Sequence, residues 1–412
     1  MQKRQYACVI CLCGMWMFIC NMGLCSNILS VYLPFIEESG LSHSMGSSIL
    51  TIRCLFSFAA TFLVELYYRK LSLRRGILLA SLIGAASAAV YSVASSAPLG
   101  VRAFLYYTGA ALGGLCYGFG TVFPVSLLLT RWFHTHRGLA LGISSAGSGV
   151  ASMVFSPLAS ALVLKYSLRT AFLAQGAFML VSALGVFLLL RDDPAQKGLP
   201  PYGEGAENGM EVTQKEGPAV LPKGVLWMLA LMMLLIGGGG QAFSGHLSVL
   251  AKSCGYSVQA AAAVVSLQGM VLVCSKLLSG ELADRFGSKR CTTLLMAVFV
   301  LGSALVMFMN GVSLFWCYAP VALMGFGSSV YNVGPPLWAG DLADRAGYPR
   351  LLRWLQLFFN LGGILFSAVP GFIADRTGEY KSSYMLIAAM ILTALLILRW
   401  SYWQGLKEKA AE

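Results

Sequence analysis

Two basic residues, Arg53 and Lys276, lie deep inside long apolar stretches of the sequence. A charge at the centre of a lipid bilayer costs roughly 2.5–3.5 kcal/mol on insertion scales, so each such residue requires a function or a partner. The acids nearest to them, Glu65 and Glu281, fall within about one turn of the ends of the same stretches. Two cations with no acid at their depth favour the binding of a negatively charged substrate.

The alternative is that both side chains are structural and reach for the membrane surface or for helix carbonyls. Lys276 lies about eight residues, or ~12 Å of helix, from the end of its stretch, which is a long reach for a lysine. Arg53 is deeper still. The sequence favours substrate contact for both residues and leaves the structural role open.

Further polar side chains at similar depth could complete a pocket around an anion. They are Asn27, Gln268, Tyr331, Asn332, Gln356 and Asn360. Each of them alone is better explained by a hydrogen bond between packed helices. For His246, the simplest prediction is contact with water at the outer end of its helix.

The sequence contains no Ser/His/Asp set, paired carboxylates, metal-ligand spacing or phosphate-binding glycine loop. We therefore expect no catalytic residues, no metal and no cofactor. The 11 cysteines lie mainly within apolar stretches and are interpreted as small apolar fillers.

The elements that carry these residues are predicted from composition. Of the 412 residues, 57% are hydrophobic and 11% are charged, against about 25% charged in soluble proteins. Apolar runs of roughly 20 residues recur along the chain and predict an all-α membrane protein with a lipid bilayer as its solvent. The twelve predicted transmembrane helices are 7–35, 45–68, 76–97, 103–130, 139–164, 170–190, 224–250, 258–283, 291–310, 314–338, 354–374 and 382–398.

One long polar segment divides these helices into two groups of six. We predict an N-terminal six-helix bundle at 1–190, a cytoplasmic linker at 191–223, and a C-terminal six-helix bundle with a short cytoplasmic tail at 224–412. The composition of the linker suits a flexible segment, since it has little to bury. The basic excess needs no nucleic acid to explain it, because most Lys and Arg lie in short loops between the apolar runs.

The distribution of these cations predicts the orientation of the chain. The loops after the second, fourth, eighth and tenth helices hold twelve Lys and Arg, and the opposite loops hold six. Because positive loops stay inside, we expect a multi-pass protein of the plasma membrane with both termini in the cytoplasm.

The two halves also repeat each other. Gly118-Phe119-Gly120 in the fourth helix recurs as Gly325-Phe326-Gly327 in the tenth, an offset of 207 residues. Gly149 and Pro157 match Gly362 and Pro370 at an offset of 213. These matches predict two pseudo-symmetric six-helix bundles built from one duplicated unit.

The loop from Gly280 to Arg290 carries a more specific pattern. It resembles the loop signature of the major facilitator superfamily, G-x-L-a-D-R-x-G-r-[KR], and the resemblance implies the major facilitator fold over the whole chain. Gly280, Asp284, Arg285 and Gly287 would then form a conformational latch. In the first half Tyr68 stands where the corresponding Asp would be.

A second pattern is similar to the branch of monocarboxylate transporters and oxalate/formate antiporters. It is Arg131-Trp132-Phe133, followed by the segments at 137–142 and 146–149. This resemblance implies that Lys276 occupies the position of a substrate-binding arginine. It also implies an Asp one turn earlier in the proton-coupled members, where this chain has Leu272.

These observations predict a secondary active transporter for a small organic anion, a mono- or dicarboxylate, that works as a monomer by alternating access. Two modes of coupling stay open. An empty carrier holding two charges could return only when loaded, which is exchange, or Lys276 could release its proton, which is proton-linked symport. Because Leu272 stands where the proton-coupled members of the similar branch carry an Asp, the sequence favours exchange. The alternatives are a carrier for a neutral or drug-like solute and, from another class, a transporter-like sensor or membrane enzyme.

Overall fold

The computed structural model describes residues 2–133, 137–203, 223–342 and 348–409. The chain divides into two compact units, Met1–Met210 and Glu211–Glu412. Among the described residues, twelve helical spans are long and apolar enough to cross a membrane. The predicted all-α membrane architecture of twelve spans is confirmed.

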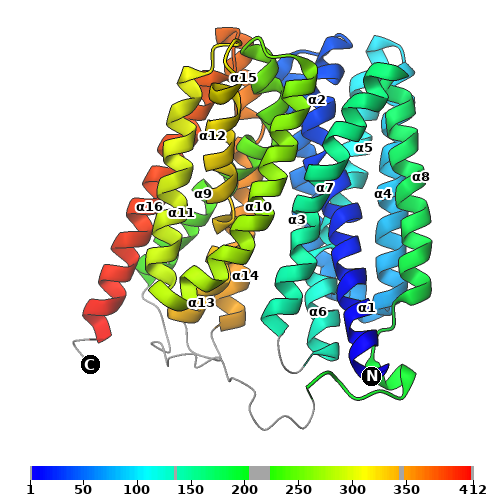
Figure 1. Ribbon diagram of the computed structural model, residues 1–412, viewed down its shortest axis with the longest axis vertical. Helices are drawn as coiled ribbons and strands as arrows, with labels where there is room; N and C mark the ends of the chain where they lie inside the picture. The colour runs from blue at the N-terminus through cyan, green and yellow to red at the C-terminus, as the bar shows by residue number, and fades with distance from the viewer. Residues whose placement is uncertain (1, 134–136, 204–222, 343–347, 410–412) are drawn as a thin grey trace. The chain divides into compact units, whose positions relative to one another are not determined.

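Unit 1 contains six of these spans, and they run side by side along a common direction (Figure 1). Tyr6 near the start donates a hydrogen bond to the Leu189 carbonyl at the end of the last span, so this unit begins and ends on one side. Its helices are α1 Gln2–Met17, η1 Phe18–Asn27, α2 Leu29–Glu38, α3 His43–Lys70, α4 Leu73–Ser96, α5 Leu99–Gly120, α6 Val122–Trp132, α7 Arg137–Lys165, α8 Leu168–Leu189 and η2 Pro194–Lys197.

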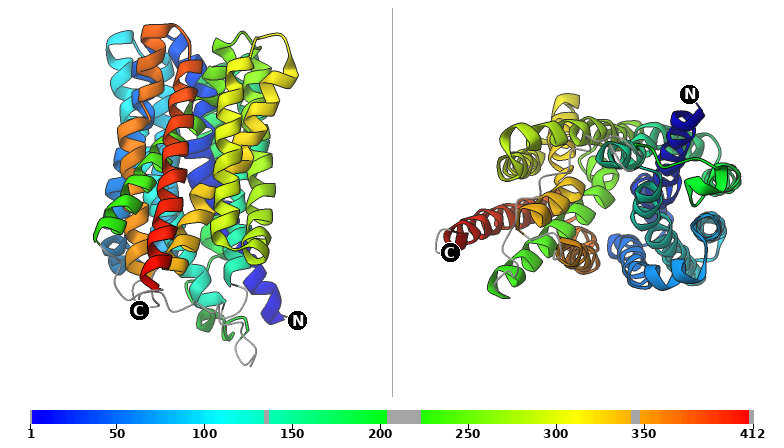
Figure 2. Two further views of the ribbon diagram at one scale, coloured as in Figure 1. Left: turned by 90° about the vertical axis from the view of Figure 1, so that its left-hand side faces the viewer. Right: turned by 90° about the horizontal axis from the view of Figure 1, so that it is seen from below.

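Unit 2 also contains six spans, and two further views show them along their length and nearly end on (Figure 2). Its helices are α9 Lys223–Ser253, α10 Val258–Phe286, α11 Ser288–Leu305, η3 Val306–Phe308, α12 Leu314–Gly327, α13 Val330–Leu342, α14 Tyr348–Phe366, α15 Val369–Thr377 and α16 Lys381–Lys409.

Serine residues begin several of these helices. The hydroxyl of a serine before the first turn accepts a hydrogen bond from a backbone N–H that has no partner within the helix. This capping occurs at Ser42, Ser72, Ser167 and Ser257, the residues before α3, α4, α8 and α10. The turns that separate apolar runs thus also fix where the spans start.

The helix packing within each unit follows one plan. In unit 1, α5 packs on α3 and α4, α4 packs on α8, and α7 packs on η1. In unit 2, α12 packs on α10 and α11, α11 packs on α16, and α14 packs on α9. Second, third, fourth, fifth and sixth spans therefore have equivalent neighbours, which confirms the predicted pseudo-symmetry of two six-helix bundles.

The repeated Gly-Phe-Gly motifs mark breaks in two spans that we predicted as continuous helices. α5 ends at Gly120, and Thr121 adopts φ −119° and ψ −108° before α6 begins. α12 ends at Gly327, and two residues separate it from the start of α13 at Val330. Glycine lowers the stability of a helix interior, and the repeated motif precedes a break in the same span of each unit.

A break in a helix exposes carbonyl groups that need another donor. The Tyr68 hydroxyl on α3 donates to the Phe119 carbonyl at 2.7 Å, and the Ser275 hydroxyl on α10 donates to the Phe326 carbonyl at 2.6 Å. The same carbonyl of each motif is therefore satisfied from the second span of its own unit.

The first and eleventh spans are also irregular. η1 is a π-helical stretch of 10 residues between α1 and α2, a local geometry that is frequent at functional sites. Between α14 and α15 the helix stops before Pro370, which lacks a backbone N–H donor.

The predicted linker starts with a packed segment. The backbone N–H of Tyr202 donates to the Trp132 carbonyl at 2.8 Å, and the Trp132 indole donates to the Arg191 carbonyl at 3.0 Å. The Asp192 carboxylate accepts from the backbone N–H of Arg74. The flexibility expected from composition therefore does not extend to residues 191–203, which are anchored to unit 1.

Candidate functional site

Arg53 lies in the middle of α3 and is 3% exposed. The central carbon of its guanidinium group is 5.6 Å from the ring centre of Tyr117 on α5, within the range of a cation–π interaction. Its Nη2 donates to the Cys54 thiol at 3.4 Å. The guanidinium is thus held inside unit 1 and does not extend to lipid.

Two glycines on α5 bring Tyr117 this close to α3. A Cβ at Gly114 would overlap the Arg53 carbonyl oxygen, and one at Gly118 would lie 2.8 Å from the Ser57 carbonyl oxygen. The two glycines are four residues apart and so lie on one face of the helix. The sequence analysis did not identify Tyr117, although its place between glycines at this spacing was a signal for close helix packing.

The asparagines of the first span take part in helix packing. Asn27, at the end of η1, donates its amide to the Ser148 carbonyl and the Ser152 hydroxyl on α7, both at 3.1 Å. The fully buried Asn21 donates to the Gly120 carbonyl at the break in the fourth span. Asn27 is partly exposed, and its amide bonds belong to the contact between η1 and α7.

Lys276 lies on α10 and is partly buried. Gln268 and Leu272 precede it at intervals of four residues on the same helix face and are 6% and 7% exposed. The backbone of Gln268 lies 3.3 Å from the position of a Cβ at Gly325, so the Gly-Phe-Gly motif of α12 packs directly on this part of α10. Lys276 therefore follows a tightly packed helix segment by two turns.

Tyr331 lies at the start of α13, and its ring covers Gly240 of α9, where a Cβ would be 2.8 Å from the ring. It is 9% exposed, and among the described residues its hydroxyl has no hydrogen-bond partner. The next residue, Asn332, is exposed.

Gln356 and Asn360 lie on α14 and are partly buried. α13 packs against both α10 and α14. The predicted polar residues of unit 2 are therefore on α13 and on two helices that contact it.

The four consecutive glycines of α9, Gly237–Gly240, serve close packing. α9 continues without interruption from Lys223 to Ser253. A Cβ at Gly237 would overlap the Phe359 carbonyl of α14, and one at Gly238 would lie 2.7 Å from the Phe366 ring. The segment is a contact surface and not a bend.

His246 does not contact outer water, and this prediction was wrong. It is fully buried, its Nδ1 lies 2.9 Å from the Ala242 carbonyl oxygen, and its ring lies 5.6 Å from that of Tyr380. Tyr380 is distant from His246 in sequence, so no local pattern indicated this contact.

The predicted latch is described only in part. Gly287 adopts φ +80°, ends α10 and precedes α11, a conformation that favours glycine. Arg285 is exposed. The surroundings of Gly280 and of the Asp284 side chain lie outside what the structure describes.

The sequence analysis missed a polar contact at the same end of unit 2. Asp341 on α13 accepts hydrogen bonds from the Tyr402 hydroxyl on α16 at 2.5 Å and from Ser288 at the start of α11 at 3.3 Å. One carboxylate thus joins three helices next to the predicted latch. Residues 402 and 288 are far from 341 in sequence, so no local pattern indicated the contact.

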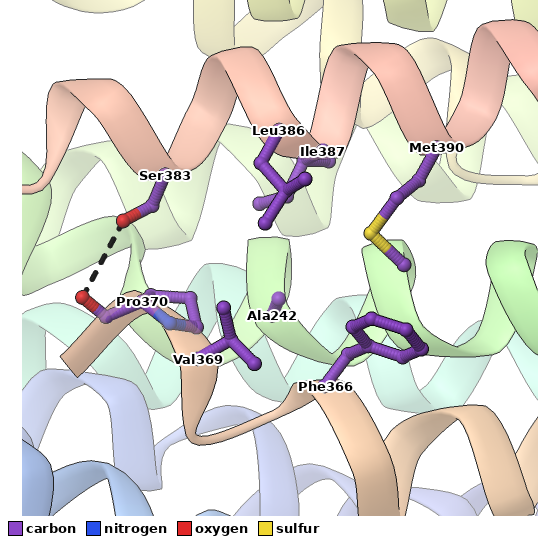
Figure 3. Close-up of a pocket in the computed structure, with 8 residues that line it drawn as sticks. All are labelled: Ala242, Phe366, Val369, Pro370, Ser383, Leu386, Ile387 and Met390. Carbon is purple, nitrogen blue, oxygen red and sulfur yellow. Dashed lines mark hydrogen bonds between the residues drawn. The ribbon is translucent and has the colours of Figure 1, made fainter. Parts of the chain in front are cut away.

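A small pocket of unit 2 lies where the eleventh span is broken (Figure 3). Apart from Ser383, whose hydroxyl donates to the Pro370 carbonyl at 3.4 Å, its lining is apolar. The residues drawn around it are Ala242, Phe366, Val369, Pro370, Ser383, Leu386, Ile387 and Met390. With no charged side chain in the lining, this pocket is unsuited to an anion.

Comparison with known proteins places the chain among transporters. The family model of the Major Facilitator Superfamily matches residues 14–352. Human monocarboxylate transporter 11 is 28% identical over 295 residues, which cover 69% of this chain and 61% of that protein. Rat monocarboxylate transporter 12 is 23% identical over 406 residues, which cover 92% of this chain and 82% of that protein. The match thus spans about three fifths of the length of the first relative.

Solved structures share the fold at low sequence identity. A D-xylose-proton symporter has a TM-score of 0.71 and 14% identity, covering 95% of this chain and 96% of that one. A bacterial homologue of the human lysosomal transporter Spinster, inward-facing and unoccupied, has a TM-score of 0.65 and 16% identity, covering 97% of each chain.

Proposed function

The chain belongs to the major facilitator superfamily, and from this premise we propose that it is a secondary active transporter for a small organic anion, a mono- or dicarboxylate. Membership makes it an integral multi-pass membrane protein of a transporter family. The substrate class is our proposal, and alternating access of the two halves is its mechanism.

The observation that carries the proposal is the burial of Arg53. Its side chain is 3% exposed within a membrane span, and the one acid of α3, Glu65, lies twelve residues further along the helix, or ~18 Å. The second cation, Lys276, lies in a span that contains no Asp or Glu from Val258 to Ser279. An anionic substrate would complement both charges.

The relatives support this substrate class. Several of them are monocarboxylate transporters, and the lysine at 276 would bind a carboxylate as a point charge. Gln268, Tyr331, Asn332, Gln356, Asn360 and Asn27 are the polar residues from which we propose that further substrate contacts come.

We further propose that the loop from Gly280 to Gly287, with Asp284 and Arg285, latches one state of the transport cycle. The contact of Asp341 with Ser288 and Tyr402 supports this, because it fixes the helix that follows the loop. Both termini would lie in the cytoplasm of a plasma-membrane protein that works as a monomer.

Uptake by proteoliposomes tests the proposal. The purified protein is offered labelled formate, lactate, oxalate and succinate in parallel with glucose and a labelled nucleoside. We expect saturable uptake of at least one carboxylate and none of the neutral solutes. Uptake of a neutral solute alone would replace this proposal with a carrier for uncharged cargo.

A further inference from the structure

The contact between Arg53 and Tyr117 joins two helices of unit 1. The guanidinium centre lies 5.6 Å from the ring centre, and Arg53 is 3% exposed while Tyr117 is partly exposed. Attraction between a cation and the face of an aromatic ring is strongest where water is excluded. Because the Arg53 side chain is buried, the contact is stronger than one on a protein surface.

The backbone geometry holds the ring in place. Gly114 lies about one turn before Tyr117 on α5, and Gly118 directly follows it. Each glycine would meet the backbone of α3 if it carried a side chain. Because the two backbones touch on both sides of Tyr117, the backbone from which its ring extends is fixed beside Arg53 on α3. The sequence Gly-x-x-x-Gly thus sets the position of the ring.

An arginine can contact an aromatic ring and bind a carboxylate at the same time. Its N–H donors lie in the guanidinium plane, whereas an aromatic ring interacts with the face of that plane. A ring that fixes the plane therefore reduces the freedom that the side chain loses when it binds a carboxylate.

We propose that Tyr117 is a positioning residue that orients Arg53 and thereby sets the affinity for the transported anion. The proposal rests on the proposed function, in which Arg53 binds the anion. The ring does this through its electron-rich face, so the hydroxyl group is not required.

Three variants distinguish the effect of the Tyr117 ring from that of its hydroxyl and from that of another tyrosine on the same helix. Tyr117→Phe keeps the ring, Tyr117→Leu removes it, and Tyr107→Leu removes a partly exposed tyrosine from the outer part of the same helix. With the panel carboxylate that the wild type takes up fastest, we expect KM to rise about 3- to 30-fold in Tyr117→Leu. The KM of Tyr117→Phe and of Tyr107→Leu should stay within about twofold of the wild-type value, because both variants keep an aromatic ring at position 117.

Fluorinated phenylalanines at position 117 test the electronic origin while the shape of the ring is kept. Each added fluorine withdraws electron density from the ring face and weakens its attraction for a cation. We expect KM to rise stepwise from phenylalanine to the trifluoro form. A KM that is constant across the series would overturn the proposal, and this holds even if Tyr117→Leu fails to fold.

Arg53→Gln separates this inference from the proposed function. If Arg53→Gln transports the carboxylate as well as the wild type, the proposed role of Arg53 fails and the role of Tyr117 with it. If Arg53→Gln is impaired while the fluorinated series is flat, only the role of Tyr117 fails.

Discussion

Arg53 and Lys276 differ in how they can present a charge to an anion. Arginine offers a planar fork that matches both oxygens of a carboxylate, whereas lysine offers one compact ammonium group on a flexible stem. The guanidinium of Arg53, on α3, is held against Tyr117 of α5, and Lys276 lies partly exposed on α10. In our account the first charge orients the anion and the second holds it.

The rate of carboxylate uptake by Lys276 variants should depend on whether the new side chain is positively charged. One desolvated, charge-assisted contact contributes roughly 1.5–3 kcal/mol, so Lys276→Gln should lower carboxylate uptake about 10- to 150-fold. Lys276→Arg should retain much of the activity because it keeps the charge. Initial uptake rates in proteoliposomes measure both, and Lys165→Gln, at an exposed lysine that ends α7, is the control. Wild-type rates in Lys276→Gln would exclude substrate contact.

A cysteine at position 53 should be reached by water-soluble reagents. In a protein whose 11 native cysteines have been replaced, we expect Arg53→Cys to react with a membrane-impermeant thiosulfonate in at least one state of the transport cycle. Phe62→Cys on the same helix, at a side chain that is 73% exposed, is the control expected to face lipid and stay unreactive. Protection of position 53 in both inward- and outward-trapped protein would make Arg53 structural.

At the scale of helices, the breaks in the fourth and tenth spans form a matched pair. Each break follows Gly-Phe-Gly, and each Phe carbonyl accepts from a hydroxyl on the second span of its unit. Tyr68, which replaces the expected Asp of the first-half loop signature, is one of these donors. Its hydroxyl thus has a structural task that an aspartate would not fulfil as a donor.

Removal of these hydroxyls should destabilise both units unequally. A buried carbonyl that loses its donor costs about 1–3 kcal/mol. Tyr68→Phe should lower the unfolding midpoint in detergent by more than Ser275→Ala does, because Ser329 also donates to the Phe326 carbonyl at 3.1 Å. Ser266→Ala is the control, since that hydroxyl donates to its own helix at Ala262. Unchanged midpoints in both test variants would show that the break does not depend on these bonds.

The spans and their breaks were not equally predictable. Apolar runs are dictated by the bilayer, so the twelve spans and the duplicated motifs could be found from sequence. The break at Thr121 depends on local backbone angles, and the Arg53–Tyr117 contact depends on the register between α3 and α5. Burial of His246 and the bonds of Asp341 depend on helices distant in sequence. Tertiary packing of this kind leaves no local signature.

At the scale of the whole molecule, Arg53 and Lys276 both lie in the second span of their units. In the proposed mechanism, a carrier that returns empty would have to change state with both charges inside the membrane and no substrate anion, which is costly. Leu272, 7% exposed, stands one turn before Lys276 where the proton-coupled members of the similar branch carry an Asp. We therefore favour exchange of one anion for another over proton-linked symport.

The most direct measurement of this account is uptake of a labelled carboxylate into proteoliposomes loaded with the same unlabelled carboxylate, loaded with glucose, or empty. Each preparation is measured without a pH gradient and with an imposed one. We predict rapid uptake only into carboxylate-loaded vesicles, with little response to the gradient. Strong uptake into empty vesicles that follows the proton gradient would contradict exchange, and no carboxylate uptake under any condition would contradict anion transport itself.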